Sequence, residues 1–253
     1  MRRVLLTALV LLAQPAFAGD KDKLYGTTLD ERTVLAFKVS DAAVQKMLPE
    51  GWQIDAPSAG PSKGANLSVV LVDQILAQDA EGKRVDAVHG AALVVPAKKQ
   101  GMEKGVPMVI GGFFSPASYA PGPYSNFIYA KADIERKIHS DPSGRAMIEE
   151  SWKFTTDAGD SIELQIQYTR GEAVRGSVEA PVYSAAKPDF YRIYRYEQAT
   201  DVVRSTGTAT DRVQKLSFKA SGQHLAPLFD GSEQLVSVTS IPFYTRQIYL
   251  PGS

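Results

Sequence analysis

Alternation of apolar and polar residues is the clearest pattern along this chain. In residues 161–168, isoleucine, leucine and tyrosine occupy every second position, and glutamate or glutamine fills the positions between them. Successive side chains of a β-strand point to opposite faces of a sheet, so one face of this strand should be dry and the other wet or lining a polar cavity. Residues 151–156 form the preceding strand, and Gly159 in the polar link between the two can close a hairpin.

Further strand patterns occur on both sides of this hairpin. Residues 66–72 and 91–95 are short runs rich in valine and leucine that are bounded by glycine and proline, as buried strands tend to be. Residues 189–196 and 200–205 are predicted to form a further pair of strands near the carboxyl end. Together these segments predict an antiparallel sheet large enough to curl.

Helix patterns are fewer. Ser40 or Asp41 can cap a helix over residues 42–48, which Pro49 ends because proline has no amide hydrogen and clashes with the preceding turn. Residues 131–139 are predicted to form a second helix, since two isoleucines four positions apart share one helical face. Residues 221–228 are expected to include a turn of helix before a proline.

The first eighteen residues have the pattern of a secretory signal peptide. Arg2 and Arg3 supply positive charge, residues 4–13 are apolar, and Ala16-Phe17-Ala18 offers small residues for cleavage before Gly19. The apolar run is shorter than the roughly 20 residues that cross a bilayer as a helix, although a retained anchor is the alternative. We expect a signal peptide over residues 1–18 and one domain over 19–253, located in the periplasm or outside the cell and not attached to the membrane after cleavage.

Composition narrows the classes of partner. Lysine plus arginine and aspartate plus glutamate number 28 each, and no basic stripe suggests a nucleic acid or an acidic membrane surface. The chain has no cysteine, which excludes a disulfide framework and a lipid-modified cysteine. With three scattered histidines, we expect no dedicated metal site, and no motif suggests a cofactor. A small molecule is the expected partner, and a homo-oligomer is left open.

Two segments near the ends of the chain resemble the acetoacetate decarboxylase-like superfamily. Residues 37–57 resemble its opening unit, in which a strand and a short helix lead through Leu-Pro-Glu to Ile-Asp-Ala-Pro. Residues 216–218, 224–228 and 235–251 resemble its closing unit, with an Ala-Pro-Leu turn and a long final strand that ends in Leu-Pro. The resemblance implies a mainly β (α+β) fold, a cone-shaped and mostly antiparallel β barrel with a few flanking helices.

The resemblance also implies where the chemistry of the family lies. In that family a lysine attacks the ketone of a β-keto acid, and the resulting iminium ion accepts the electrons released with carbon dioxide. The motif Gly-Arg-Glu followed by Pro-Lys-Lys falls, without a gap, on residues 122–124 and 129–131. Ala130 then occupies the position of the nucleophile, Tyr124 that of the glutamate, and Asn66 lies near the place of another acidic residue. A slip of one residue would instead make Lys131 the nucleophile. A second alternative is that Tyr124 and a carboxylate serve as acid and base.

Aromatic residues cluster in the same stretch, interleaved with glycine and proline. Such rings can line a concave apolar pocket or pack as a core beneath a long loop, and both interpretations are open. The residues are Phe113, Phe114, Tyr119, Tyr124, Phe127 and Tyr129.

Three functions are compatible with these features. The favoured one is an exported protein whose aromatic pocket, with Asn66 at its edge, binds a small carbonyl or carboxylate compound without decarboxylation by the family mechanism. The alternative is a lyase that acts on a small oxo acid through a Schiff base at Lys131. The third, an exported scaffold that binds another protein through a sheet edge, has no specific pattern behind it.

Overall fold

The computed structural model describes residues 22–252, and its architecture is mainly β, with 61% strand and one short helix. This confirms the expected fold class. The strands, in chain order, are β1 (Lys23–Lys38), β2 (Trp52–Ile54), β3 (Leu67–Asp79), β4 (Arg84–Val85), β5 (His89–Lys99), β6 (Val106–Ser115), β7 (Phe127–Tyr129), β8 (Lys131–Ser140), β9 (Ala146–Thr155), β10 (Ser161–Thr169), β11 (Val174–Ser184), β12 (Tyr191–Ser205), β13 (Thr210–Asp211), β14 (Val213–Ser221) and β15 (Gln234–Leu250). The helix is α1 (Asp41–Gln45), and a 3-10 turn spans Ala117–Tyr119.

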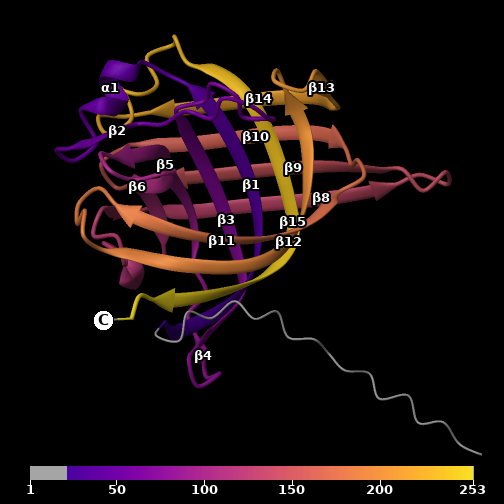
Figure 1. Ribbon diagram of the computed structural model, residues 1–253. Coiled ribbons are helices and arrows are strands. Elements are labelled where there is room, and N and C mark those ends of the chain that lie inside the picture. Colours follow the sequence, from indigo (N-terminus) through magenta and orange to yellow (C-terminus); the bar gives the residue numbers. More distant parts are fainter. Residues whose placement is uncertain (1–21, 253) are drawn as a thin grey trace, which may run out of the picture.

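Seven strands close a ring. Their pairing runs β5, β3, β1, β15, β12, β11 and β6, and β6 pairs with β5 again. All of these pairings are antiparallel except the short contact between β6 and β11. Figure 1 shows the long strands β1 and β15 crossing behind β11 and β12, which curve around the front of the ring. The ring therefore has an inner face and an outer face, and each strand contributes alternate side chains to both.

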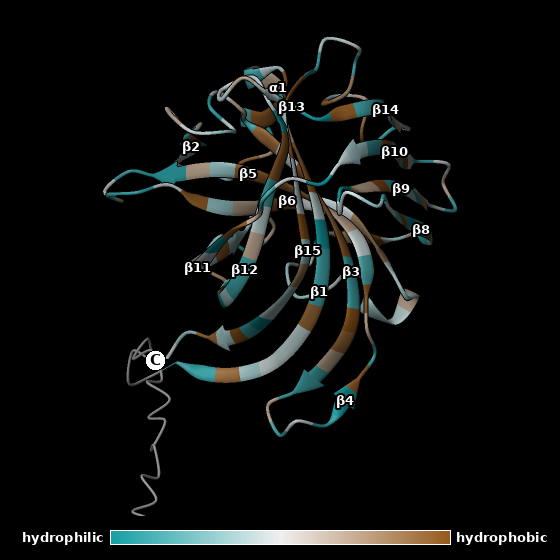
Figure 2. Ribbon diagram, turned by 90° about the vertical axis from the view of Figure 1, so that its right-hand side faces the viewer, coloured by the Kyte–Doolittle hydropathy of each residue, from teal (hydrophilic) through white to brown (hydrophobic). Residues whose placement is uncertain are grey.

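A second sheet of four strands, in the order β14, β10, β9 and β8, covers part of the outer face. Figure 2 shows these strands stacked beside β1, β3 and β15. Phe37 of β1, Phe154 of β9 and Leu164 of β10 belong to one apolar cluster between the two sheets, with exposed fractions of 2% or less. Each such side chain contributes about 1.5–3 kcal/mol when it is fully buried. This core covers part of the outer face of the ring, and the second sheet does not cover the inner face.

Of the three predicted helical segments, only the first is a helix, and α1 ends at Gln45. Ser40 caps α1, because its side chain accepts a hydrogen bond from the Ala43 amide. The helix predicted over residues 131–139 is wrong, because that segment is the edge strand β8, paired with β9 over ten positions. Residues 223–228 form turns and no helix, although two bonds of helical type join the Ala226 amide to the Gly222 carbonyl and the Phe229 amide to the Leu225 carbonyl.

The strand predictions were closer. The hairpin around Gly159 is confirmed, with a φ of 88° at the glycine and a bond from the Thr156 amide to the Asp160 carbonyl. The pair of strands predicted over 189–196 and 200–205 is one continuous strand, β12. No turn separates its halves because both pair with the same partner, β15.

The signal peptide predicted over residues 1–18 lies outside the described residues, as does its cleavage site. Among residues 22–252, no helix has the length and apolar character that crossing a membrane requires.

Candidate functional site

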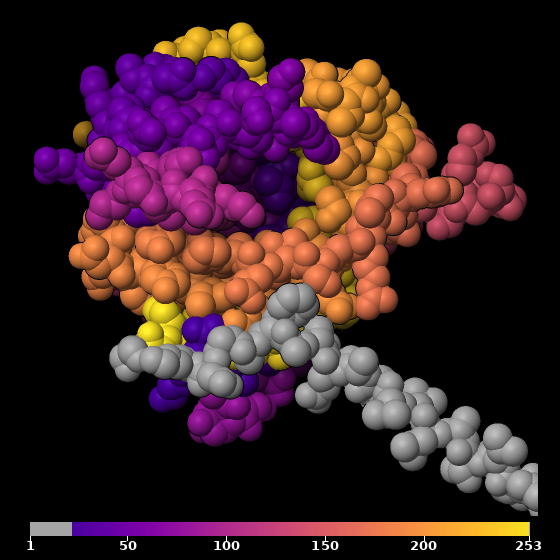
Figure 3. Space-filling view, viewed as in Figure 1, coloured from indigo at the N-terminus to yellow at the C-terminus, as the bar shows by residue number. Residues whose placement is uncertain are grey.

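A cavity of about 1280 Å³ occupies the inside of the ring. It follows the inner face of β1 from Tyr25 to Val34, a stretch of about 30 Å in extended backbone. Figure 3 shows a hollow framed by the purple segment before β3, the magenta start of β6 and the orange strands β11 and β12, with indigo and yellow atoms at its bottom. Pockets for drug-sized ligands measure about 300–1,000 Å³, so this space can enclose an organic molecule of considerable length.

Three arginines from neighbouring strands line the cavity: Arg32 of β1, Arg192 of β12 and Arg246 of β15. The register joins their strands directly, since Tyr196 pairs with Arg246 and Arg246 pairs with Thr28. Arg246 is neutralised within the wall, where one of its terminal nitrogens lies 3.0 Å from a carboxylate oxygen of Asp30, a residue with 0% exposure. Charge balance in the cavity therefore depends on the other two arginines.

Arg32 has no carboxylate partner among residues 22–252. It donates a hydrogen bond of 2.7 Å to the side-chain oxygen of Gln198, and its guanidinium carbon lies 4.3 Å from the centre of the Tyr244 ring. Its Nε is buried and has no hydrogen-bond partner in this part of the chain. A ring face and a neutral amide stabilise a cation less than a carboxylate does.

Arg192 is the least compensated of the three. The residue is 8% exposed, and across residues 22–252 it makes no ion pair and its buried Nε has no hydrogen-bond partner. Its guanidinium carbon lies 4.2 Å from the centre of the Tyr25 ring. Burying a charge is costly unless a partner neutralises it, and no described residue supplies a counter-charge to Arg192.

Aromatic rings form another part of the cavity lining. Phe114 stacks on Phe127 with ring centres 4.1 Å apart, and the Tyr124 hydroxyl donates a hydrogen bond of 2.8 Å to the Tyr194 hydroxyl. Burial raises the pKa of Tyr119 to about 12 and that of Tyr124 well above its ordinary value. Both hydroxyls therefore stay protonated at neutral pH and do not act as bases. The single proton of Tyr124 is engaged by Tyr194, which leaves the Tyr119 hydroxyl as a hydrogen-bond donor.

The predicted aromatic cluster is divided by the structure. Four of its members line the cavity: Phe114, Tyr119, Tyr124 and Phe127. Phe113 points the other way, into the apolar core between the sheets, and Tyr129 does not line the cavity. Asn66 is fully buried elsewhere, where its side chain bonds both backbone groups of Val39. Both interpretations of the cluster, pocket and core, are thus realised by different residues.

Lys131 lies away from the cavity. Its side chain is 76% exposed at the start of β8, and its amine is 3.8 Å from a carboxylate oxygen of Asp157. Ala130, at the position of the family nucleophile, is fully buried. Among residues 22–252, no lysine lines the cavity. The described lining of the cavity therefore contains no lysine amine that could act as a nucleophile.

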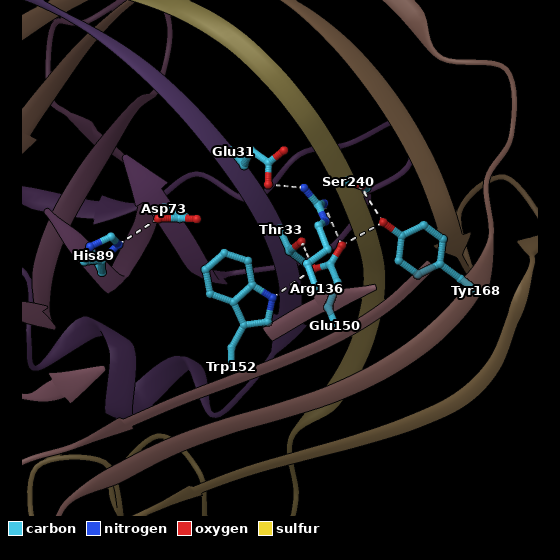
Figure 4. A network of polar contacts seen from close by, with 9 residues as sticks. All are labelled: Glu31, Thr33, Asp73, His89, Arg136, Glu150, Trp152, Tyr168 and Ser240. Carbon is cyan, nitrogen blue, oxygen red and sulfur yellow. Dashed lines mark hydrogen bonds and ion pairs between the residues drawn. The ribbon is translucent and has the colours of Figure 1, made fainter. Parts of the chain in front are cut away.

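A second group of polar residues lies on the outer face of the ring, and Figure 4 shows it. Arg136 of β8 bridges the carboxylates of Glu31 and Glu150, with 2.7 Å to the latter. Glu150 is 3% exposed and also accepts hydrogen bonds from Thr33, Trp152 and Tyr168 at 2.6–2.8 Å. Because its two oxygens already have four partners, this carboxylate has little capacity left for a ligand.

His89 extends this row of polar residues across the ring. Glu31, Asp73 and His89 are cross-strand neighbours on β1, β3 and β5. The His89 Nδ1 lies 2.7 Å from Asp73, and this hydrogen bond raises the pKa of the histidine despite its partial burial. Within residues 22–252, no group of three or more His, Asp or Glu side chains has the arrangement to hold a metal ion.

The arginines of the cavity were not predicted from the sequence. The pattern was present in β12, where Arg192, Tyr194, Tyr196 and Gln198 occupy alternate positions and all line the cavity. Large polar and aromatic side chains on one face of a long strand indicate a wet interior instead of a packed core.

Comparison with known proteins gives a consistent fold. No protein-family model matches the sequence, and no curated protein matches it. Among solved structures, the chain is similar to the enduracididine biosynthesis enzyme MppR complexed with pyruvate, with a TM-score of 0.58, 10% identity and coverage of 91% of this chain and 90% of that chain. It is also similar to acetoacetate decarboxylase from Legionella pneumophila, with a TM-score of 0.52, 12% identity and coverage of 98% and 96%.

A third match is an acetoacetate decarboxylase-like enzyme from Sphingomonas wittichii, with a TM-score of 0.52, 10% identity and coverage of 91% of this chain and 92% of that chain. At these identities the likeness concerns the fold. Since the matches extend over most of each chain and agree with the resemblance of the two terminal segments, this chain has the acetoacetate decarboxylase-like fold.

Proposed function

We propose that this chain is an exported binding protein that holds a small organic carboxylate in the ring cavity and does not decarboxylate it through a lysine. The observation that carries the proposal is Arg192, a buried guanidinium that faces the cavity without a counter-charge among residues 22–252. Arginine binds carboxylates through two parallel hydrogen bonds, which fit its planar fork. The pyruvate in complex with MppR supports an organic acid as the ligand.

The absence of an amine from the described wall supports binding without Schiff-base chemistry. The cavity offers guanidinium groups and protonated tyrosines, which orient an acid and donate hydrogen bonds. Neither a guanidinium nor a protonated tyrosine forms a Schiff base with a ketone. The ligand would thus leave the cavity unchanged.

Calorimetric titration with a panel of organic acids tests the binding. We expect at least one carboxylate to bind, and we expect Arg192→Met to weaken its binding at least about 10-fold, because charge-assisted hydrogen bonds contribute about 1.5–3 kcal/mol. Arg175→Met is the matched control: it removes the same charge from a side chain that is 80% exposed, and it should leave the affinity unchanged. Equal loss in both variants would indicate nonspecific attraction to the net charge, and binding that persists in Arg192→Met would refute the assignment.

Export is tested separately. Expressed with its first residues in a Gram-negative host, the chain should appear in the periplasmic fraction with Gly19 as its first residue. Retention in the cytoplasm with Met1 in place would refute this part of the proposal and leave the binding assignment standing.

A further inference from the structure

We infer that the ligand of this cavity is an elongated dianion, with one acidic group for each unpaired arginine and an apolar or unsaturated body between them. This inference rests on the proposed function and narrows its ligand class. It follows from the charge of the cavity wall, from the spacing of the two arginines and from the character of the wall between them.

The charge of the wall is the first step. Of the three lining guanidiniums, Asp30 neutralises that of Arg246, so two positive charges remain. Three other acidic residues belong to the lining: Asp55 and Asp86 are exposed, and Asp79 accepts backbone hydrogen bonds in its own hairpin. A ligand with two negative charges supplies a counter-charge to both open arginines, whereas a monoanion leaves one of them without a counter-charge.

The spacing of the two arginines is the second step. The Arg32 guanidinium lies over Tyr244, and that of Arg192 lies over Tyr25. Tyr25 of β1 lies between Leu24, which pairs with Tyr249 of β15, and Gly26, which pairs with Ile248. Tyr249 is five positions from Tyr244 along β15, which corresponds to about 15 Å in extended backbone. One carboxylate is much too small to reach both guanidiniums, but the two ends of a long molecule can.

The wall between the arginines is the third step. Tyr194 and Tyr196 occupy the inward positions of β12 between Arg192 and Gln198, the residue that Arg32 bonds. Their rings, with those of Tyr119 and Phe127, offer apolar faces. Two polar groups in this stretch are already engaged, since Arg246 pairs with Asp30 and the Tyr124 hydroxyl bonds that of Tyr194. A hydrocarbon or conjugated chain therefore fits this stretch better than a polyhydroxylated one, which needs a free partner for each hydroxyl group.

A chain-length series tests the inference. Wild-type protein is titrated with unbranched dicarboxylates of four to twelve carbons and with the monocarboxylate of each length. We expect affinity for the dicarboxylates to peak at an intermediate or long chain, where it exceeds that of the equally long monocarboxylate at least 30-fold. Arg32→Met and Arg192→Met should each reduce this advantage below about threefold, and Arg175→Met should preserve it.

The outcomes separate the two proposals. If monocarboxylates bind as tightly as dicarboxylates at every length, the dianion is refuted while carboxylate binding stands. If no carboxylate of either series binds to wild-type protein with an intact unfolding transition, carboxylate binding itself is refuted. Arg32→Gln and Arg192→Gln, which keep hydrogen-bond donors, serve where a methionine variant fails to fold, and an undiminished preference for dicarboxylates in them would also refute the inference.

Discussion

Arg136 and Arg192 are both largely buried. Arg136 lies over the outer face of the ring and Arg192 on its inner face, and the two differ in their charged neighbours. Arg136 lies between the carboxylates of Glu31 and Glu150 in the space beneath the second sheet. Arg192 faces the cavity, and its guanidinium lies over the ring of Tyr25. A buried charge that the chain neutralises itself has a structural role, whereas a buried charge left open predicts a ligand. Counting counter-charges therefore distinguishes scaffold from site more clearly than burial does.

The same substitution at both positions tests this comparison most severely. Arg136→Met leaves two carboxylates without their cation, one of them fully buried, and should lower the free energy of unfolding by about 3–5 kcal/mol. Urea denaturation measures the change. Arg175→Met on the surface should leave stability nearly unchanged, and an Arg136 variant as stable as this control would contradict the structural role.

Arg192→Met should have the opposite sign. Removing a buried guanidinium that lacks a counter-charge should raise the free energy of unfolding by about 1 kcal/mol in the absence of ligand, at the expense of binding. The measurement is again urea denaturation, without added organic acids. A loss of stability comparable to that of the Arg136 variant would show that Arg192 is part of the scaffold and would remove the distinction between the two faces.

The hydrogen bond between His89 and Asp73 should make the stability of the outer face depend on pH. Because this bond raises the pKa of folded His89 above that of the unfolded chain, its contribution is complete below about pH 6.5 and is lost as the pH rises through the folded pKa. The difference in stability between wild type and His89→Gln should shrink between pH 6 and 8. Since the side chain is 39% exposed, the change should stay below about 1 kcal/mol, and a difference that grows with pH would contradict this assignment.

Lys131 should show the smallest effect. Incubation with acetoacetate or pyruvate and borohydride should add no mass at this residue, because the amine lies in solvent outside the cavity. Lys131→Met should change the free energy of unfolding by no more than about 0.5 kcal/mol. Intact-mass measurement, with an acetoacetate decarboxylase that has its lysine pair as the positive control, decides the matter; an adduct mapped to Lys131 would revive the Schiff-base alternative.

Much of the fold was accessible from local pattern. The alternation in residues 161–168 predicted β10 and its dry face, and Gly159 predicted the hairpin before it. The segment at 131–139 misled because Ile134 and Ile138 fit both a helix and every second position of a strand. Pairing with β9 decided in favour of the strand, an interaction that no local pattern contains.

The site was less accessible because it depends on register. Tyr124 and Phe127 could be placed in a pocket by their neighbours in sequence, yet Phe113 points away because side-chain direction alternates along β6. The pairing of Asp30 with Arg246 joins residues near opposite ends of the chain, and only strand register brings them together. That pairing decides which arginines remain open, so the charge of the cavity could not be derived from composition.

Strand β1 contributes side chains to both faces of the ring. Arg32 points toward the cavity, whereas Glu31 and Thr33 point toward the buried carboxylate of Glu150. Inserting or deleting a single residue before Glu31 would exchange the two sets of side chains. Length variation among descendants of this chain should consequently avoid β1 and accumulate at exposed tips such as the β3–β4 turn. New ligand preferences should then arise by replacement of cavity-lining side chains, such as Arg32 of β1 and Arg192 of β12, while the register of β1 in the ring stays unchanged.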